Sequence, residues 1–124
     1  MPLSRSRVVA FVSTAQPAAA LRFYRDLLGL RLIEENGFAL VFDANGTMLR
    51  VTIVEHVTRA PYTVLGWTVS SISDAVDALR TRGVALLRFN GLAQDDRGIW
   101  QSPSGARVAW FADPDGNVLS VTEP

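Results

Sequence analysis

Few side chains in this chain of 124 residues could do chemistry. There is one histidine, His56, and no cysteine, which excludes a thiol nucleophile, a disulfide and a metal site with two histidine ligands from one chain. All 12 basic residues are arginine, which excludes a Schiff-base lysine and the lysine of a phosphate-binding loop. Asp95, Asp96 and His56 remain as candidates for an acid or a base. The histidine lies in a linker and the aspartates in a polar loop, where such residues are most often solvated.

The overall charge is neutral, with 12 acidic against 12 basic side chains. A protein that binds nucleic acid by electrostatic attraction would carry a basic excess, so we expect no nucleic-acid partner. No stretch approaches the roughly 20 apolar residues that cross a bilayer, and residues 1–7 lack the apolar core of a signal peptide. We therefore expect a folded cytoplasmic protein with no membrane partner.

Hydrophobic periodicity and turn residues predict the elements that position these side chains. In the first half, apolar residues at helical spacing predict a helix over 18–28 that ends at Gly29. Asn36-Gly37 predicts a hairpin turn, and residues 43–46 predict another. The strands predicted in this half are 8–12, 31–35, 38–42 and 48–55.

The same order of elements begins again after a proline-containing linker over 56–61. Ser71 and Asp74 are spaced as a capping box, in which Ser71 accepts from a backbone N–H and Asp74 reaches back. Gly83 ends this second helix as Gly29 ends the first. The strands predicted in this half are 64–69, 85–89, 99–101, 107–112 and 118–122, with a polar loop over 90–98.

An internal repeat relates the two halves. Residues 43–52 align with residues 113–122 at a shift of 70, and five of the ten positions are identical. Agreement of a turn and a strand at matching places favours a duplication. We therefore expect an α+β fold, a single domain of two βαβββ modules at about 7–56 and 62–122, whose curled sheets surround a shared cleft.

Two motifs carry a resemblance to a known family. Phe23-Tyr-Arg-Asp-Leu-Leu-Gly-Leu30 follows the first predicted strand, and Trp110-Phe-Ala-Asp-Pro-Asp-Gly-Asn117 precedes the last. In this order and with this repeat, they resemble the vicinal oxygen chelate superfamily, which includes glyoxalase I, bleomycin-resistance proteins and extradiol dioxygenases. The resemblance covers essentially the whole chain. It implies the two-module fold and does not specify a reaction.

The resemblance also implies four metal-ligand positions, on the first and last strands of each module, where His, Gln or Glu would stand. In this chain those positions are Val9, Arg50, Val64 and Ser120. Valine has no donor atom and arginine is a fixed cation, so this set cannot hold a divalent metal. We therefore expect no metal and no cofactor, and no metal-dependent glyoxalase, epimerase or dioxygenase activity.

Arg50 interrupts the apolar pattern over 48–54. It either lines the cleft, where a guanidinium binds a carboxylate, phosphate or enolate oxygen, or faces solvent, or pairs with Asp95, Asp96 or Glu55. Side chains two residues apart in a strand share a face, which predicts a mostly apolar pocket with a few hydroxyl groups. The ligand-binding residues predicted in this way are Phe11, Arg50, Thr52, Thr68, Trp100 and Ser120.

The three tryptophans have different predicted roles. Trp67 alternates away from Thr68, so we expect it to pack toward the helices. Trp100 lies beside the polar loop, from which it could stack on a planar ligand. The role of Trp110 is not decided by its spacing.

These observations favour a metal-free, small-molecule-binding protein. It would sequester or sense an apolar or aromatic compound with an anionic group, as the bleomycin-resistance branch binds drugs without catalytic residues. One alternative is a lyase, isomerase or dioxygenase of the same fold that acts on a small oxygenated substrate. Another is an interaction module with a filled cleft. We expect a homodimer, because the edges of curled sheets must be paired or covered.

Overall fold

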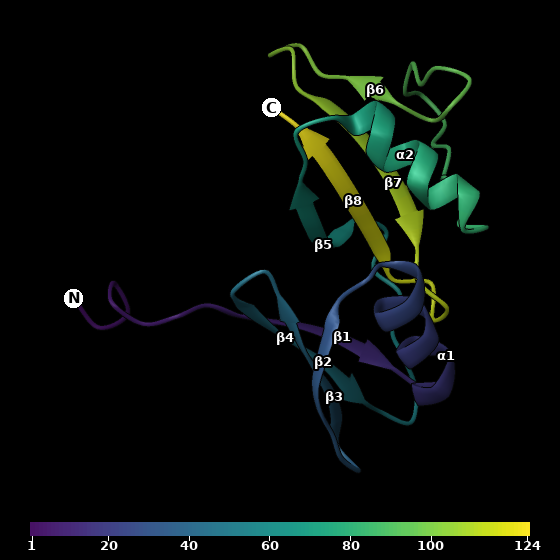
Figure 1. Cartoon of the computed structure of the whole chain (residues 1–124). Coiled ribbons are helices and arrows are strands. Elements are labelled where there is room, and N and C mark those ends of the chain that lie inside the picture. The colour runs from purple at the N-terminus through teal and green to yellow at the C-terminus, as the bar shows by residue number, and fades with distance from the viewer. The chain divides into compact units, whose positions relative to one another are not determined.

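A computed structural model describes the whole chain, Met1–Pro124, which divides into two compact units, Met1–Val57 and Thr58–Pro124 (Figure 1). Each unit holds one four-stranded mixed sheet and one helical segment. The expected α+β class is therefore confirmed. No helical segment has the length and apolar character that crossing a membrane requires.

The first unit has the strand order β1-β4-β3-β2, in which β1 runs parallel to β4 and the other pairs are antiparallel. Parallel neighbours need a crossover, which the helical segment and two strands provide. Its elements are β1 (Val9–Thr14), α1 (Pro17–Leu21), η1 (Arg22–Leu27), β2 (Arg31–Glu35), β3 (Ala39–Ala44) and β4 (Thr47–Ile53).

The helix of this unit begins at Pro17 and widens into a π-helix from Arg22 onward. The Leu28 N–H donates to the Phe23 carbonyl over 2.9 Å, a bond across five residues. Tyr24 is fully buried, and its ring lies 6.0 Å from that of Phe42 in β3, so the helix covers this face of the sheet. The helix predicted over 18–28 is therefore confirmed. The change to π-helical hydrogen bonding is not predicted from the sequence.

Two turns of different construction join the strands of this sheet. Between β3 and β4, Asn45 and Gly46 both have positive φ, 53° and 95°, as a two-residue hairpin turn requires. Between β2 and β3, the Asn36 side-chain oxygen instead accepts from the amides of Phe38 and Ala39. Both predicted turns are present.

The second unit has the corresponding strand order β5-β8-β7-β6, again with one parallel pair, β5 and β8. The equivalence of the two orders agrees with the repeat seen in the sequence. Its elements are β5 (Thr63–Thr68), α2 (Ile72–Thr81), β6 (Trp100–Gln101), β7 (Arg107–Ala112) and β8 (Val118–Glu123).

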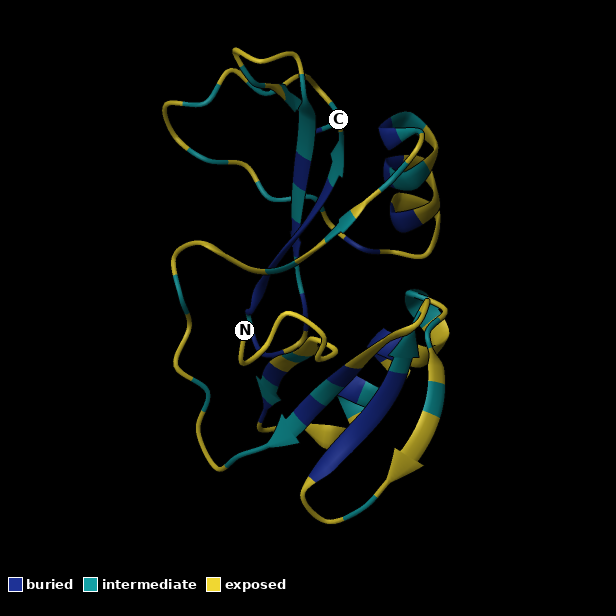
Figure 2. Cartoon of the chain, turned by 90° about the vertical axis from the view of Figure 1, so that its left-hand side faces the viewer, coloured by how far each residue is buried: buried dark blue, intermediate teal, exposed yellow.

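Helix α2 has defined ends. The Ser71 hydroxyl accepts from the Asp74 amide over 3.2 Å, which is half of the predicted capping box. No bond from the Ser71 amide to the Asp74 side chain completes the box, and Glu123 of β8 instead accepts from the first helical amide, that of Ile72. At the far end, the amides of Gly83 and Val84 bond back to the last turn, as a glycine with positive φ allows. Figure 2 shows the buried residues of this helix gathered along one side.

The predicted strand over 85–89 is wrong. Only Leu86 forms an isolated bridge, with Phe111 of β7, and the short β6 occupies the other end of the same edge. The Gln94 side chain explains the difference, because it donates to the Leu87 carbonyl and accepts from the Phe89 amide. These backbone groups are therefore bonded to a side chain instead of to a neighbouring strand.

Candidate functional site

Arg50 stands in the middle of the first sheet, on the face opposite the helix. Its Cα pairs with Phe11 of β1 on one side and with Val41 of β3 on the other. Its neighbours along β4, Leu49 and Val51, are fully buried on the helix-covered face. The pairing also places Thr52 beside Ser13, so the predicted residues of this half, Phe11, Arg50 and Thr52, lie on one face.

Apolar side chains surround this arginine and remain accessible. Phe11 is 60% exposed, and Val9 and Met48 are also exposed. The Arg50 residue itself is only partly exposed. It forms no ion pair and no side-chain hydrogen bond within its unit, and the Glu55 carboxylate considered as a partner lies instead 3.8 Å from His56. A half-buried guanidinium without an acid retains its full attraction for an anion.

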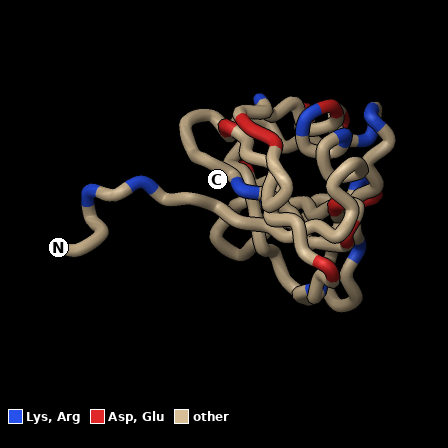
Figure 3. Tube along the Cα trace, turned by 90° about the horizontal axis from the view of Figure 1, so that it is seen from below, with Lys and Arg blue, Asp and Glu red and all other residues tan.

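Another arginine of this sheet, Arg31, is already paired with an acid. Figure 3 shows basic and acidic positions interspersed along the chain, so an anion site must be sought at individual arginines that lack acidic partners. At the edge of the same sheet, Arg31 lies 3.2 Å from Asp43, and both line a pocket of about 360 Å³. The Gly46 amide and then Arg31 lower the pKa of Asp43. Arg50 is therefore the better candidate in this sheet.

The second sheet presents hydroxyl and aromatic groups on the face opposite α2. One row across it runs from Gly66 through Ser120 to Trp110. A second row runs from Thr68 through Thr122 and Val108 to Trp100. The pairing therefore places the three predicted residues of this half, Thr68, Trp100 and Ser120, on one face.

Trp110 belongs to this face and is missing from the residues predicted from the sequence. Its ring lies 6.1 Å from that of Trp100 and meets Phe89 edge-to-face at 5.3 Å. Its indole N–H donates to the Thr63 hydroxyl over 3.2 Å. Alternation along the strand that pairs with Ser120 is the sequence signal that could have found it. Trp67 lies on the opposite face and stacks on Phe111, as expected.

A close approach of two strands fixes Ser120. A Cβ built on Gly66 would lie 2.7 Å from the Ser120 hydroxyl oxygen, which is shorter than any ordinary contact. Gly66 is therefore the residue that allows this hydroxyl to sit where it does. Neither Gly66 nor this packing is foreseen from the sequence.

The acid and base candidates do not lie on either face. The His56 side chain is 90% exposed beyond the end of β4. The Asp95 carboxylate accepts from the amides of Arg97 and Ile99 and so shapes its own loop. Asp96 lies at the rim of a separate pocket beneath α2.

The residues present do not fit a divalent metal. In the first unit the two implied ligand positions hold Val9 and Arg50, and in the second they hold Val64 and Ser120. Val64 also falls at a register shift in β5, where it has no partner in β8. No group of three or more His, Cys, Asp or Glu side chains in the structure could hold a metal ion. This donor set offers one hydroxyl and a fixed cation, so we derive no chemistry through a metal.

Comparison with known proteins gives one family. The sequence model described as Glyoxalase/Bleomycin resistance protein/Dioxygenase superfamily matches residues 7–121. No curated protein sequence matches the chain significantly.

Solved structures give the same fold. A glyoxalase family protein from Enterococcus faecalis is 23% identical with a TM-score of 0.70, covering 99% of this chain and 100% of that one. A glyoxalase/bleomycin resistance protein/dioxygenase from Alicyclobacillus acidocaldarius is 17% identical with a TM-score of 0.70, covering 99% and 94%. A lactoylglutathione lyase from Agrobacterium tumefaciens is 19% identical with a TM-score of 0.70, covering 97% and 95%. At these identities the likeness establishes the fold alone.

Proposed function

Given that this chain belongs to the Glyoxalase/Bleomycin resistance protein/Dioxygenase superfamily, we propose that it is a small-molecule-binding protein that works without a metal. Its ligand is an apolar or aromatic compound that carries an anionic group. The anionic group binds to the guanidinium of Arg50. The fold and the family are common to binding proteins and enzymes, so the proposal depends on the site residues.

The observation that carries this proposal is the environment of Arg50. Arg50 is partly exposed on a sheet face that also carries the exposed Phe11, Val9 and Met48, and no acid of its unit pairs with it. Removing a charge from water costs free energy unless a partner replaces the water. A carboxylate or phosphate that binds in a bidentate geometry supplies that partner, and the apolar residues contact the rest of the ligand.

The second unit carries an aromatic surface of its own. Trp100 and Trp110 provide two indole rings beside the Ser120 hydroxyl. Indole faces bind planar rings by offset or edge contacts, and a hydroxyl adds one directional hydrogen bond. This surface suits a flat ligand with a polar substituent.

The enzyme alternative lacks support among the candidate catalytic residues. One structural neighbour is titled a lactoylglutathione lyase, but its likeness extends to the fold only. A general acid or base must reach the substrate's proton at hydrogen-bond distance. His56 is almost fully exposed outside the sheet, and the Asp95 carboxylate is bonded to backbone amides. His56 is therefore not placed to act on a ligand held at Arg50, and the Asp95 carboxylate is already engaged within its own loop.

A thermal-shift screen of chelator-treated protein tests this proposal. Each aromatic carboxylate, such as 1-naphthoate, is paired with its neutral alcohol. We expect carboxylates to raise the unfolding midpoint more than the alcohols do, because only they supply an anion for Arg50. Adding zinc, nickel, iron or manganese should change nothing. Equal shifts from acids and alcohols would contradict the anion site, and a ligand response that returns only with metal would contradict the metal-free function.

A further inference from the structure

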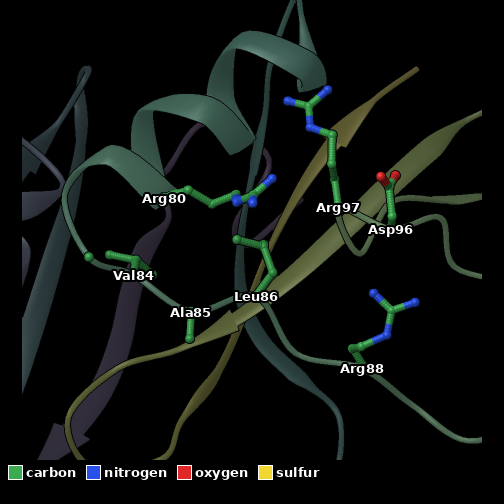
Figure 4. A pocket seen from close by; sticks show the side chains of 8 residues that line it. Arg80, Val84, Ala85, Leu86, Arg88, Asp96 and Arg97 are labelled. Atoms are coloured by element: carbon green, nitrogen blue, oxygen red, sulfur yellow. The ribbon is translucent and has the colours of Figure 1, made fainter.

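A pocket of about 390 Å³ lies in the second unit, between the end of α2, the segment that follows it and the loop before β6 (Figure 4). Nothing in the proposed function uses it. Three arginines and one acid line its rim, and apolar side chains form its floor. The residues that matter here are Arg80, Val84, Leu86, Arg88, Asp96 and Arg97.

The three arginines of this pocket differ in their partners. Arg97 donates to the Asp77 carboxylate and to the hydroxyl and carbonyl oxygens of Ser73, so its charge is neutralised by α2. Arg80 has no ion pair and no side-chain hydrogen bond. Arg88 has no acidic partner and donates only to the Gln94 carbonyl over 3.2 Å. Two unpaired guanidinium groups therefore border the same cavity.

Hydrogen bonds between the segments that line this cavity fix its walls. The Gln94 side chain bonds to the Leu87 carbonyl over 2.9 Å and to the Gly98 carbonyl over 2.8 Å, which joins two of the walls. The Leu87 amide donates to the Trp110 carbonyl over 2.7 Å and ties the same segment to the sheet. Arg97 joins the loop to α2. A ligand would therefore find these walls already assembled, which lowers the entropy lost on binding.

The floor and the charge of the cavity indicate the kind of ligand. Val84 is 7% exposed and Leu86 is half-buried, so the floor is apolar. The two unpaired guanidinium groups outnumber the Asp96 carboxylate, so the lining carries a net positive charge, which attracts a phosphate monoester with its one and a half to two negative charges at neutral pH. The Asp96 carboxylate forms no ion pair and is available to accept a hydrogen bond from a ligand hydroxyl.

We propose that this pocket is a second ligand site, which binds a small phosphomonoester. Arg80 and Arg88 bind the phosphate oxygens, and the organic part contacts Val84 and Leu86. The site lies wholly within the second unit. It is therefore independent of Arg50.

Titration calorimetry with phenyl phosphate tests this site on the full chain carrying Arg50→Met, which removes the other proposed anion site. We expect one equivalent to bind, and phenol, which has no charge, to bind at least about tenfold more weakly. The double variant Arg80→Met, Arg88→Met should weaken binding of phenyl phosphate by at least about tenfold. The matched control is Arg82→Met, which removes an exposed arginine that bonds only to the Ala78 carbonyl of its own helix. Equal unfolding midpoints confirm that all variants fold.

Two further measurements distinguish this pocket from the Arg50 site and test the preference for a phosphomonoester. The unmodified protein, which keeps the proposed Arg50 site, should bind a second equivalent of phenyl phosphate, whereas absence of all binding in Arg50→Met would overturn the pocket. Inorganic phosphate should compete, but more weakly than phenyl phosphate because it makes no contact with the apolar floor. Equal affinity for inorganic phosphate would overturn the monoester assignment, and no binding of either compound would overturn the site.

Discussion

Arg50 stands where the resemblance to the family implies a metal ligand. A metal ligand donates an electron pair to a cation, whereas an arginine side chain is itself a cation. A metal-bound substrate oxygen is held by an ion, whereas a guanidinium holds it by charge and two parallel N–H donors. The backbone register supports this reading, since Arg50 pairs with Phe11 and Val41 in the centre of the sheet. We propose that Arg50 itself supplies the positive charge at this position, without an ion.

Replacing Arg50 by Met should change the free energy of unfolding of the ligand-free protein by less than about 1 kcal/mol. The physical reason is that no acid of its unit is left unpaired, and Met fills similar apolar space. Urea denaturation of both proteins, with Arg22→Met as the exposed-arginine control, measures this. A loss of about 3–5 kcal/mol would mean that Arg50 pairs with an acid of its own chain, contrary to our account.

The sequence located some site residues better than others for a physical reason. Alternation in β4 is clear, because one charged residue interrupts an apolar run, and it brought Arg50, Thr52 and Phe11 to one face. In β7, the aromatic residues Trp110 and Phe111 are adjacent and therefore point to opposite faces. Their residue types alone do not show which of the two faces the core. The register with β8 decides it, and places Trp110 beside Ser120.

At the scale of elements, β4 and β8 have the same place in their sheets. Each lies between a parallel first strand and an antiparallel third strand, and Arg50 and Ser120 hold the same row at the predicted shift of 70. The repeat was visible in the sequence because a turn and a strand were copied together. The unequal residues at these two places have separated the roles of the halves, a cation in one and a hydroxyl in the other.

Gly66→Ala should destabilise the protein by about 1–3 kcal/mol, because the new Cβ would meet the Ser120 hydroxyl and force it to move. Adding Ser120→Ala should recover most of that loss, since it removes the obstructing oxygen. The free energies of unfolding of the two single variants and the double variant measure this coupling. Gly37→Ala is the control, because nothing lies within 4 Å of its Cβ. If the effects of the two changes on the free energy of unfolding are additive, contact between the new Cβ and the Ser120 hydroxyl is not the cause of the loss.

Two elements were not predicted correctly, and side-chain chemistry explains one of them. The run over 85–89 has strand composition, but a distant amide side chain, that of Gln94, takes its hydrogen bonds. Propensity cannot foresee such a competitor. The π-helix of η1 was also missed, because Phe23 and Tyr24 fit the apolar stripe of an ordinary helix as well.

At the scale of the whole molecule, exposed apolar residues and open strand edges call for a partner. Ile33 is an exposed apolar residue of β2, and β2 and β6 each end a sheet. Surfaces of this kind are normally covered in stable proteins. We therefore propose that the protein is a homodimer.

Light scattering coupled to size exclusion, at micromolar concentration, should give twice the chain mass of 13.5 kDa. Ile33→Ser should shift the equilibrium toward the single chain, because it removes an exposed apolar side chain at the edge strand β2. Phe38→Ser, at an exposed turn, is the control. A mass of one chain for the unmodified protein would contradict the proposal.

The central claim is that Arg50 binds the anionic group of a small ligand without a metal. The most direct measurement is the affinity of the strongest aromatic carboxylate from the screen, determined by calorimetry with chelator-treated protein and with Arg50→Met. Our account predicts a loss of about 2–5 kcal/mol in the variant, as expected when one member of a desolvated charge pair is removed. Arg22→Met should bind as the unmodified protein does. An unchanged affinity in Arg50→Met would contradict the account.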